Sequence, residues 1–379
     1  MTLYLMSVAT VFHLYVYWKL RAAFGSGRWS LFFFGTLAFF IVLPLTRYYE
    51  LFDSNRFFEI TFALTITEYI IVGMICTVLV LTDILRIILC LWDKARKTNA
   101  ESLFSPRIAA VFSLAFVSCI VVYGYYEAWN VRKVHIVISS HKLPENTERL
   151  RVVQISDIHI GGVYPIRHLE RVMEMVRAAE PDIFVVTGDL VDGNMTHRSR
   201  EAKLISAHGA KYGSFAIAGN HEHIAGLDQA FDFFERCGLT FLDDQMTETA
   251  GITIIGLDDM TTFWPFRQQT PQDRFVLLLK HRQNVMKSSL GKFDLQLCGH
   301  THGGQIWPLG FLHQKLQGYT QGLSKTGESF VYVSNGTGYW APPIRFLTPP
   351  EVTVIDIVNP EKGLNPFPMT NSNAKHITS

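Results

Sequence analysis

Hydrophobic and polar positions divide the chain into two parts of different character. Residues 1–129 are crowded with Phe, Leu, Ile, Val, Tyr and Trp, whereas residues 130–379 alternate short apolar runs with polar segments. A membrane-spanning helix needs about 20 mostly apolar residues. Stretches that approach or meet this length lie at 2–20, 29–45, 60–81 and 108–126. We therefore predict an all-α transmembrane bundle of about four spans over residues 1–129.

The first of these stretches is predicted to remain in the mature protein, because it lacks a basic leading region and a small-residue cleavage site. Two ionisable residues fall inside the predicted spans, where a charge is costly and often functional. Glu68 is either protonated and hydrogen-bonded inside the bundle or part of a proton relay or transport path. His13 is expected to be a packed, hydrogen-bonded residue rather than a ligand.

Basic residues in the short loops predict the orientation of the bundle, because cytoplasmic loops carry an excess of Lys and Arg. The first and third loops are the basic ones, with Lys19, Arg21 and Arg28 in one and Arg86, Lys94, Arg96, Lys97 and Arg107 in the other. The second loop has Arg47 and Arg56 diluted by Glu50, Asp53 and Glu59. Arg132 and Lys133 after the last span oppose this bias. The balance predicts a multi-pass protein whose termini and residues after 129 lie outside the cytoplasm.

The second part of the chain is predicted to be an α/β domain. Continuous apolar runs, typical of buried strands, lie at 150–156, 182–187, 214–218 and 295–298. Helical patterns lie at 165–180, 226–237 and 271–288. Further strands at 252–257, 329–334 and 351–357 have no helix between them, so part of the sheet should be antiparallel. We expect two packed mixed β-sheets flanked by helices over 150–357, a linker at 130–149 and a flexible tail at 358–379.

Polar residues with metal-binding chemistry follow several of the predicted strands. They are Asp157, His159, Asp189, Asn220, His221, His300 and His302, with His281 before the last pair. Ligands gather beyond the carboxyl ends of strands in layered α/β sheets. The set combines carboxylate, imidazole and amide groups without thiolates, which suits manganese, iron or zinc rather than a structural zinc cage.

The arrangement predicts a pair of divalent metal ions. Two nearby dications need a shared anionic ligand, which an Asp at a strand-to-loop turn can supply. The glycines beside these residues, Gly188, Gly219 and Gly299, allow the backbone to approach the metals closely. Such a pair clamps a phosphoryl group and activates a water molecule for in-line attack.

Each signal is weak when it is taken alone. An Asp-x-His is more often solvated surface than ligand, and His281, between Lys280 and Arg282 in a helix-like stretch, would by itself be assigned to the surface. The combination is far more specific, because five such elements occur in order and four of them end an apolar run. The first three begin about 31 residues apart, which is one strand-plus-helix unit each.

The second part of the chain resembles the calcineurin-like metallophosphoesterases. That family's motifs correspond here to Asp157-Ile158-His159, Gly188-Asp189-Leu190-Val191-Asp192, Gly219-Asn220-His221-Glu222, His281 and Gly299-His300-Thr301-His302. The continuation Gly303-Gly304-Gln305 and the segments Pro342-Pro343-Ile344-Arg345 and Pro349-Pro350-Glu351 resemble the subgroup with many membrane-anchored members. The resemblance covers roughly 150–357 and includes every core motif.

The resemblance implies a role for each residue. Asp157, His159 and His302 would hold one metal ion; Asn220, His281 and His300 would hold the second, and Asp189 would bridge the two. His221 would face the leaving-group oxygen and stabilise or protonate it. Asp192 would support this site without binding metal, and Glu222 would either orient His221 or lie on the surface.

Two further features of the sequence each allow two interpretations. The segment 258–267 joins acidic to aromatic residues and is either a substrate-facing lid or a packed surface loop. Arg345 either binds a phosphate or holds the C-terminal segment in place.

Composition narrows the class of protein. A formal net charge of +1 gives no electrostatic basis for nucleic-acid binding. The five cysteines form no disulfide framework, and Cys237 and Cys298 are expected to be buried thiols.

The sequence therefore predicts a membrane-anchored dimetal hydrolase of phosphate esters or phosphoanhydrides, with lipid-linked phosphates among the substrates that anchoring favours. Its alternatives are an enzyme resembling UDP-diacylglucosamine pyrophosphatase of lipid A synthesis, whose activity faces the cytoplasm, a non-enzymatic scaffold, and a transporter that would rest on Glu68 alone. The substrate-binding residues, the substrate itself and the metal stay undetermined at this stage.

Overall fold

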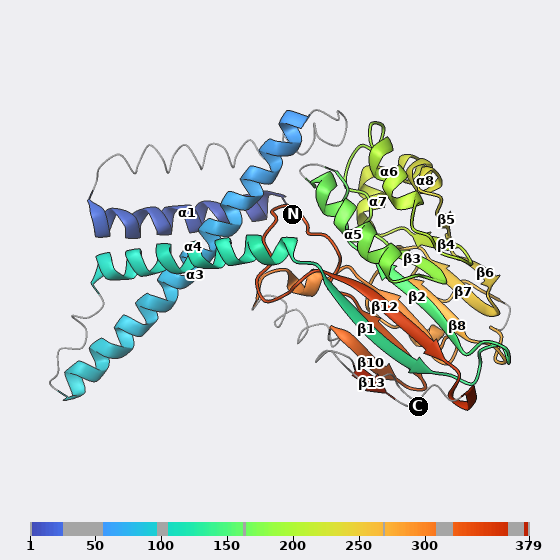
Figure 1. Ribbon diagram of the computed structural model, residues 1–379. Coiled ribbons are helices and arrows are strands. Elements are labelled where there is room, and N and C mark those ends of the chain that lie inside the picture. The colour runs from blue at the N-terminus through green and yellow to red at the C-terminus, as the bar shows by residue number, and fades with distance from the viewer. Residues whose placement is uncertain are drawn as a thin grey trace. The chain divides into compact units, whose positions relative to one another are not determined.

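The structure of the chain is a computed structural model (Figure 1). It describes residues 2–25, 56–96, 105–161, 164–267, 270–307, 321–362 and 375–377. The chain divides into two compact units, Met1–Gly124 and Tyr125–Ser379. Each unit is described by itself below.

The first unit is helical, as the sequence predicts. Its helices are α1 (Thr2–Phe24), α3 (Arg56–Arg96) and α4 (Pro106–Trp129), the last of which continues into the second unit. Two stretches in the described helices are long and apolar enough to cross a membrane, Ala63–Trp92 and Pro106–Trp129. The stretch predicted at 2–20 is helical but is not one of these two, and the one predicted at 29–45 lies outside the described residues.

Helix α3 is longer than the predicted span at 60–81. At 41 residues it measures about 60 Å, twice the hydrocarbon thickness of a bilayer. Arg86 and Lys94, which the sequence places in a loop, therefore lie on this helix. The stretch between them is apolar apart from Asp93, so the sequence offers no breaker that would end the helix earlier.

Polar side chains join α1 to α3. His13 Nε2 lies 2.7 Å from Glu68 Oε1, and His13 is only 1% exposed. Asp83 accepts hydrogen bonds from the Tyr15 hydroxyl at 2.6 Å and from the Lys19 ammonium group. These contacts confirm that His13 and Glu68 are packed and hydrogen-bonded, which lowers the cost of polar groups between apolar helices.

The second unit contains two mixed β-sheets. The first sheet has the strand order β13-β1-β12-β2-β3-β4-β5. Its strands are β1 (Arg132–Ser139), β2 (Arg149–Ile155), β3 (Ile183–Thr187), β4 (Ser214–Ile217), β5 (Thr240–Phe241), β12 (Glu351–Val358) and β13 (Lys375–Ile377). The neighbours β2, β3 and β4 are parallel, whereas β12 runs antiparallel to β2.

The second sheet has the order β10-β11-β9-β8-β7-β6. Its strands are β6 (Gln245–Thr249), β7 (Ile252–Leu257), β8 (Val276–Lys280), β9 (Leu295–Cys298), β10 (Gly322–Thr326) and β11 (Ser329–Val333). The strands β7, β8, β9 and β11 are mutually parallel, and antiparallel hairpins add β6 and β10 at the edges. The predicted antiparallel component is therefore confirmed.

The two sheets pack face to face over a shared apolar core. Side chains of β2 and β3, such as Val152 and Val185, meet side chains of β8 and β9, such as Leu277 and Leu295, and all four are 0% exposed. Helices cover the outer face of the first sheet, namely α5 (Ile166–Ala178), α6 (Ser199–Ser206) and α8 (Leu227–Arg236). Short elements complete the unit, α7 (Asn220–Ala225), η2 (Lys287–Ser289), η3 (His302–Gly304) and η4 (Pro360–Lys362). Two packed mixed sheets with flanking helices are thus present.

One predicted element is wrong, and two predicted connecting or terminal segments contain strands. The helix expected at 271–288 is wrong, because the five residues of β8 are all buried in the middle of the second sheet. The linker expected at 130–149 contains β1, which pairs with β12 from Arg132 to Ser139. The tail expected to be flexible contributes β13, which pairs with Ile136–Ile138 of β1. In each case a long-range strand partner decides the structure of a short, ambiguous segment.

Candidate metal centre

The carboxyl ends of five parallel strands bring the predicted site residues to one edge of the two sheets. Asp157 and His159 follow β2, Asp189 follows β3, and Asn220 with His221 begins α7 after β4. From the second sheet, His281 follows β8 directly, and His300 and His302 follow β9. Residues far apart in the chain, such as Asp157 and His302, therefore become neighbours.

The backbone at this edge is unusual. Five of these residues, which are not glycine, have positive φ angles: Asp157 (55°), His159 (56°), Asp189 (51°), His300 (70°) and His302 (49°). Such left-handed conformations are uncommon outside glycine and concentrate at functional sites. The positive φ angles turn the chain sharply just after each strand and direct the side chains toward one another.

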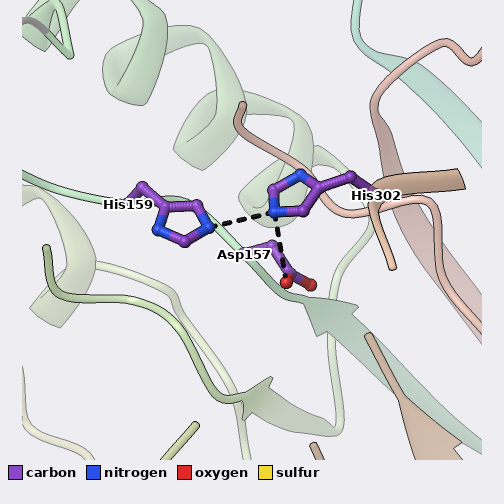
Figure 2. A group of neighbouring side chains, drawn as sticks. All are labelled: Asp157, His159 and His302. Carbon is purple, nitrogen blue, oxygen red and sulfur yellow. Dashed lines mark hydrogen bonds and ion pairs between the residues drawn. The ribbon is translucent and has the colours of Figure 1, made fainter. Parts of the chain in front are cut away.

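The first cluster consists of Asp157, His159 and His302 (Figure 2). His302 Nε2 lies 3.0 Å from His159 Nε2 and 3.5 Å from Asp157 Oδ1. Their potential ligand atoms all lie within 4.8 Å of one another, and all three residues are buried. These are the residues that the sequence assigns to one metal ion.

The second cluster consists of Asp189, His281 and His300. His281 Nε2 lies 3.2 Å from Asp189 Oδ2 and 3.2 Å from His300 Nδ1. His281 Nδ1 donates a hydrogen bond of 2.8 Å to the carbonyl of Thr187, the last residue of β3. This bond places the ring proton on Nδ1 and leaves Nε2 free to bind a metal ion, as in many metal-binding histidines.

Asn220, the first residue of α7, offers a further oxygen at this edge of the sheets. Its Oδ1 is buried and has no hydrogen-bond partner, a costly state for an amide oxygen. A metal ion bound there would satisfy it, because amide oxygens bind manganese and related ions. The donor set of carboxylates, imidazoles and one amide therefore fits two divalent ions that share Asp189.

The pKa values of the site agree with this assignment. Burial lowers the pKa of His159 to about 4 and that of His300 to about 3, so both rings are neutral as metal binding requires. Burial, helped by the charge of Asp189, raises the pKa of Asp157 to about 6. Burial opposes protonation of His281, but the Asp189 carboxylate outweighs it and raises its pKa to about 10. The two carboxylates thus attract positive charge into a buried site, and a metal ion would supply that charge.

The predicted glycines permit this close packing. A Cβ at Gly188 would lie 2.5 Å from His281 Nδ1, and one at Gly219 would lie 2.8 Å from His281 Nε2. A Cβ at Gly299 would collide with the side chains of Ser156 and Asp157. Any larger residue at these positions would have to displace a ligand side chain.

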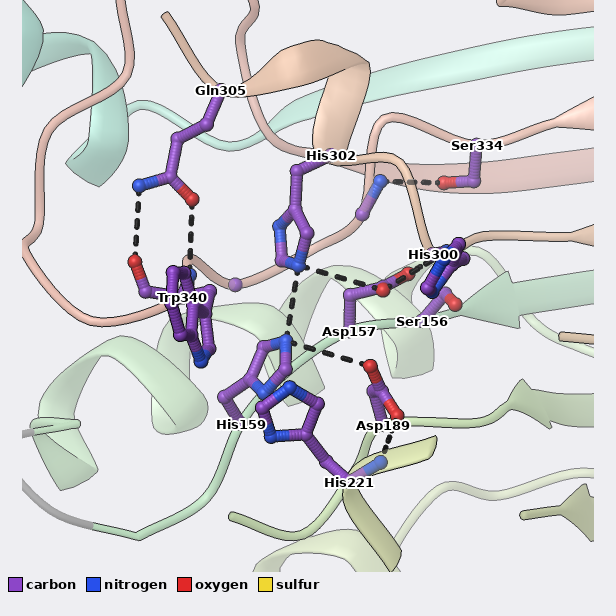
Figure 3. Close-up of polar contacts among 12 residues, drawn as sticks. Ser156, Asp157, His159, Asp189, His221, His300, His302, Gln305, Ser334 and Trp340 are labelled. Atoms are coloured by element: carbon purple, nitrogen blue, oxygen red, sulfur yellow. Dashed lines mark hydrogen bonds and ion pairs between the residues drawn. The ribbon is translucent and has the colours of Figure 1, made fainter. Parts of the chain in front are cut away.

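His221 lies beside His159 and Asp189 (Figure 3), and Asp192 contacts its ring. Its Nδ1 lies 3.1 Å from Asp192 Oδ1, and its backbone N–H donates to Asp189 Oδ1 at 2.9 Å. The His221 ring meets that of His159 edge to face, with centroids 4.5 Å apart. The Trp340 ring also lies near that of His221, with centroids 6.2 Å apart. Asp192 therefore orients His221, and Trp340, which the sequence analysis did not single out, borders the site.

Glu222 differs from both sequence interpretations, since it is neither on the surface nor bonded to the His221 ring. It is 0% exposed, and its carboxylate accepts hydrogen bonds from the backbone N–H groups of Gly219, Asp189 and Val191 at 2.7–2.9 Å. The carboxylate therefore ties the β3 and β4 loops together beneath the metal site. Burial and the charge of Asp189 raise the pKa of Glu222 to about 7.

Arg345 is fully buried, which decides between its two interpretations. Its guanidinium donates to the carbonyls of Gly338, Asn335 and Thr348, and Nη2 also lies 3.0 Å from His302 Nδ1. With its donors engaged in this way, Arg345 holds the C-terminal segment against His302 and is not placed to bind a substrate.

The segment 258–267 contributes a contact that the sequence did not reveal. Asp259 binds the guanidinium of Arg282, and Arg282 in turn lies next to His300. Trp264 is buried, whereas Met260 and Phe263 are more than 60% exposed, at 69% and 67%. Asp259 and Trp264 therefore anchor the segment, whereas the side chains of Met260 and Phe263 are exposed to solvent.

Comparison with known proteins identifies the family. Residues 150–304 match the family model described as calcineurin-like phosphoesterase. An uncharacterised metallophosphoesterase of Aquifex aeolicus is 32% identical over 248 residues, which cover 62% of this chain and 95% of the relative. The chain belongs to the metallophosphoesterase family.

Other members extend the similarity. A metallophosphoesterase of Campylobacter jejuni is 30% identical and covers 73% of this chain and 76% of its own length. A zebrafish relative, 29% identical over 65% of this chain and 62% of its own length, is named transmembrane protein with metallophosphoesterase domain. As a metallophosphoesterase, this protein is a hydrolase of phosphorylated compounds, and it carries two N-terminal stretches that are apolar enough for membrane anchoring.

Proposed function

We propose that the protein is a membrane-anchored hydrolase that cleaves phosphate esters or phosphoanhydrides with two divalent metal ions. The observation that carries this proposal is the pair of ligand clusters at the strand ends, with Asp189 between them. Asp189 lies within 3.9 Å of His159 and within 3.2 Å of His281, one residue from each set. A carboxylate in this position can bridge two ions.

Each group in the site has a defined task. Two bound ions would supply Lewis acidity to the phosphoryl oxygens and lower the pKa of an attacking water molecule. Asp157, His159 and His302 would hold one ion, and Asn220, His281 and His300 the other. His221, oriented by Asp192, would donate a proton or hydrogen bond to the leaving oxygen. The intact ligand set favours an enzyme over a non-enzymatic scaffold.

Exposed apolar side chains near the site favour a lipid-linked substrate. Large apolar side chains are exposed on segments that follow the motifs, with Ile224 at 49%, Trp307 at 53% and Trp340 at 38% exposed. Trp340 borders His221, and Gln305 holds its backbone through hydrogen bonds of 3.0 Å. Exposed apolar groups near a polar site support binding of an amphiphilic molecule.

Replacement of the bridging residue tests the proposal. We expect Asp189→Ala to lose both metal ions and all hydrolysis while the protein still folds, because the two ions would no longer share an anion. Metal content by plasma emission spectrometry and turnover of a phosphodiester, a phosphomonoester and a diphosphate are the measurements. An exposed carboxylate on α8, Asp232, provides the control Asp232→Ala, which should retain both. Two ions per chain in Asp189→Ala would exclude the bridging role.

A further inference from the structure

Arg282 lies directly after the metal-site residue His281 and is fixed by a buried carboxylate. Its Nε lies 2.9 Å from Asp259 Oδ1, and its Nη2 lies 2.9 Å from Asp259 Oδ2. The Asp259 side chain is 0% exposed, whereas that of Arg282 is 42% exposed. A two-point, charge-assisted contact of this kind orients the guanidinium plane and costs little further ordering when a ligand binds.

The third guanidinium nitrogen of Arg282, Nη1, lies next to the second metal cluster. Nη1 lies 3.2 Å from His300 Nε2, and the other nitrogen of that ring, Nδ1, faces His281 at 3.2 Å. The His300 ring therefore separates Arg282 from the proposed position of the second metal ion. When a metal ion occupies Nδ1, the neutral ring carries its proton on Nε2, so Nη1 and Nε2 then both need an acceptor.

Other cationic groups at the site are already engaged. Arg345 is fully buried, and its donors meet backbone carbonyls and His302. Lys280 is 2% exposed and donates to Asn284 and to the carbonyl of Arg282. Among the residues that the structure describes, Arg282 is the cation that both contacts a ligand histidine and reaches solvent.

We infer that Arg282 binds a second anionic group of the substrate, the phosphate that neighbours the scissile phosphate in a diphosphate. A phosphate bound by both metal ions would lie between the two clusters, and the Arg282 guanidinium, which contacts His300 on the side away from His281, would bind an adjoining anion. Arg282 would then select phosphoanhydrides over simple esters. This inference rests on the proposed function and narrows its substrate class; it concerns binding, and no bond changes at Arg282.

Binding of two non-hydrolysable probes to the full-length, metal-loaded protein tests the inference. Methylenediphosphonate carries two anionic groups and methylphosphonate carries one, and calorimetry measures the affinity of each. We expect Arg282→Gln to weaken methylenediphosphonate binding about 10- to 100-fold, since a charge-assisted contact is lost. Methylphosphonate binding should change less than about threefold. Metal content should stay at the wild-type level.

Two further variants guard against misfolding. Arg282→Gln leaves the buried Asp259 carboxylate without its partner, which can destabilise the segment. The double variant Arg282→Gln with Asp259→Asn removes both charges and should show the same selective loss with restored stability. Arg274→Gln, which removes a partly exposed arginine paired with Glu248 of the edge strand β6, is the matched control and should bind both probes normally.

Each remaining result has a defined meaning. Equal weakening of both probes, or loss of metal from the Arg282 variants, would overturn the inference and assign Arg282 to holding His300. Unchanged methylenediphosphonate binding would also overturn it, while wild-type metal binding and hydrolysis would leave the proposed function intact. A wild-type protein that binds no metal and neither probe would overturn both.

Discussion

His281 and Glu222 show how single residues acquire their roles from their surroundings. Nothing in the local sequence separates His281 from a surface histidine, yet its ring is 0% exposed and is oriented by the Thr187 carbonyl. Glu222 directly follows His221 in the sequence, but its carboxylate accepts hydrogen bonds from the backbone N–H groups of three residues. In both cases a buried hydrogen bond from another strand determines what the side chain does.

Substitution of His221 gives the sharpest prediction at this scale. We expect His221→Ala to retain metal and to lose turnover by about 10²-fold or more, because positioned general acids contribute 10²–10⁴. The loss should be smaller for substrates with good leaving groups such as nitrophenol, which need little protonation. Steady-state kinetics with a series of leaving groups measures it. A uniform loss across the series would instead assign His221 to positioning.

Strand pairing explains why the segment predicted as a linker at 130–149 contains β1. Strand β1 begins with exposed residues and alternates only partly, so it resembles a polar connection in sequence. Asp356 on β12 nevertheless binds Arg151 on β2 at 2.7 and 2.9 Å and His135 on β1 at 2.9 Å. This ion cluster joins three adjacent strands and makes β1 part of the sheet.

Removal of the Asp356 carboxylate should weaken the sheet. Its side chain is 7% exposed and that of Arg151 is 18% exposed, so we expect Asp356→Asn to destabilise the protein by about 2–4 kcal/mol, the low end for a buried pair. That corresponds to a fall in Tm of about 5–10 °C in thermal unfolding. The exposed pair on α8 offers the control Asp232→Asn, which should change stability by less than about 1 kcal/mol. Equal effects of the two substitutions would contradict a structural role for the cluster.

The same contact predicts a pH dependence. Burial opposes ionisation of Asp356, but hydrogen bonds from Arg151 and His135 outweigh it and hold its pKa below the usual value of 3.8. A lowered pKa in the folded state means that the stabilisation is present above about pH 4 and is lost as the pH falls further. The difference in Tm between wild type and Asp356→Asn should therefore shrink below about pH 4.

The whole molecule joins a helical unit to a metallophosphoesterase domain. Contacts within the helical unit run in the same order along both helices, since a Cβ on Gly73 would lie 3.8 Å from the Phe12 ring and Lys19 pairs with Asp83 further along. The span predicted for 29–45 lies outside the described residues, so the number of crossings stays a prediction from the sequence.

The membrane topology of the whole chain can be tested directly. The four spans and the basic first and third loops that we predict from the sequence would place the catalytic domain outside the cytoplasm. A reporter fused after Ser379 should then be active on the extracytoplasmic side, and protease added to intact cells or spheroplasts should release the domain. A cytoplasmic reporter would overturn the orientation or the span count. It would also favour a cytoplasmic substrate of the nucleotide-lipid type.

Local sequence patterns correctly predict the class of fold and propose most residues of the candidate metal centre. Asp157, Asp189, His300 and the other candidate ligands except His281 each follow an apolar run or sit in a short motif, so local spacing suffices to propose them. Apolar runs of four to seven residues likewise indicate buried strands, because a strand buried on both faces needs no partner to be recognised.

Only the tertiary structure decided the features that depend on a distant partner. The strand at 276–280, the pairing of β1 and β13, and the anchoring roles of Glu222, Arg345 and Asp259 all arise from contacts between segments more than 15 residues apart in the chain, such as Glu222 with Asp189 and Arg345 with His302. A short segment or a charged side chain has several states of similar free energy by itself. Burial against a specific neighbour selects one of them, and that neighbour cannot be read from the local sequence.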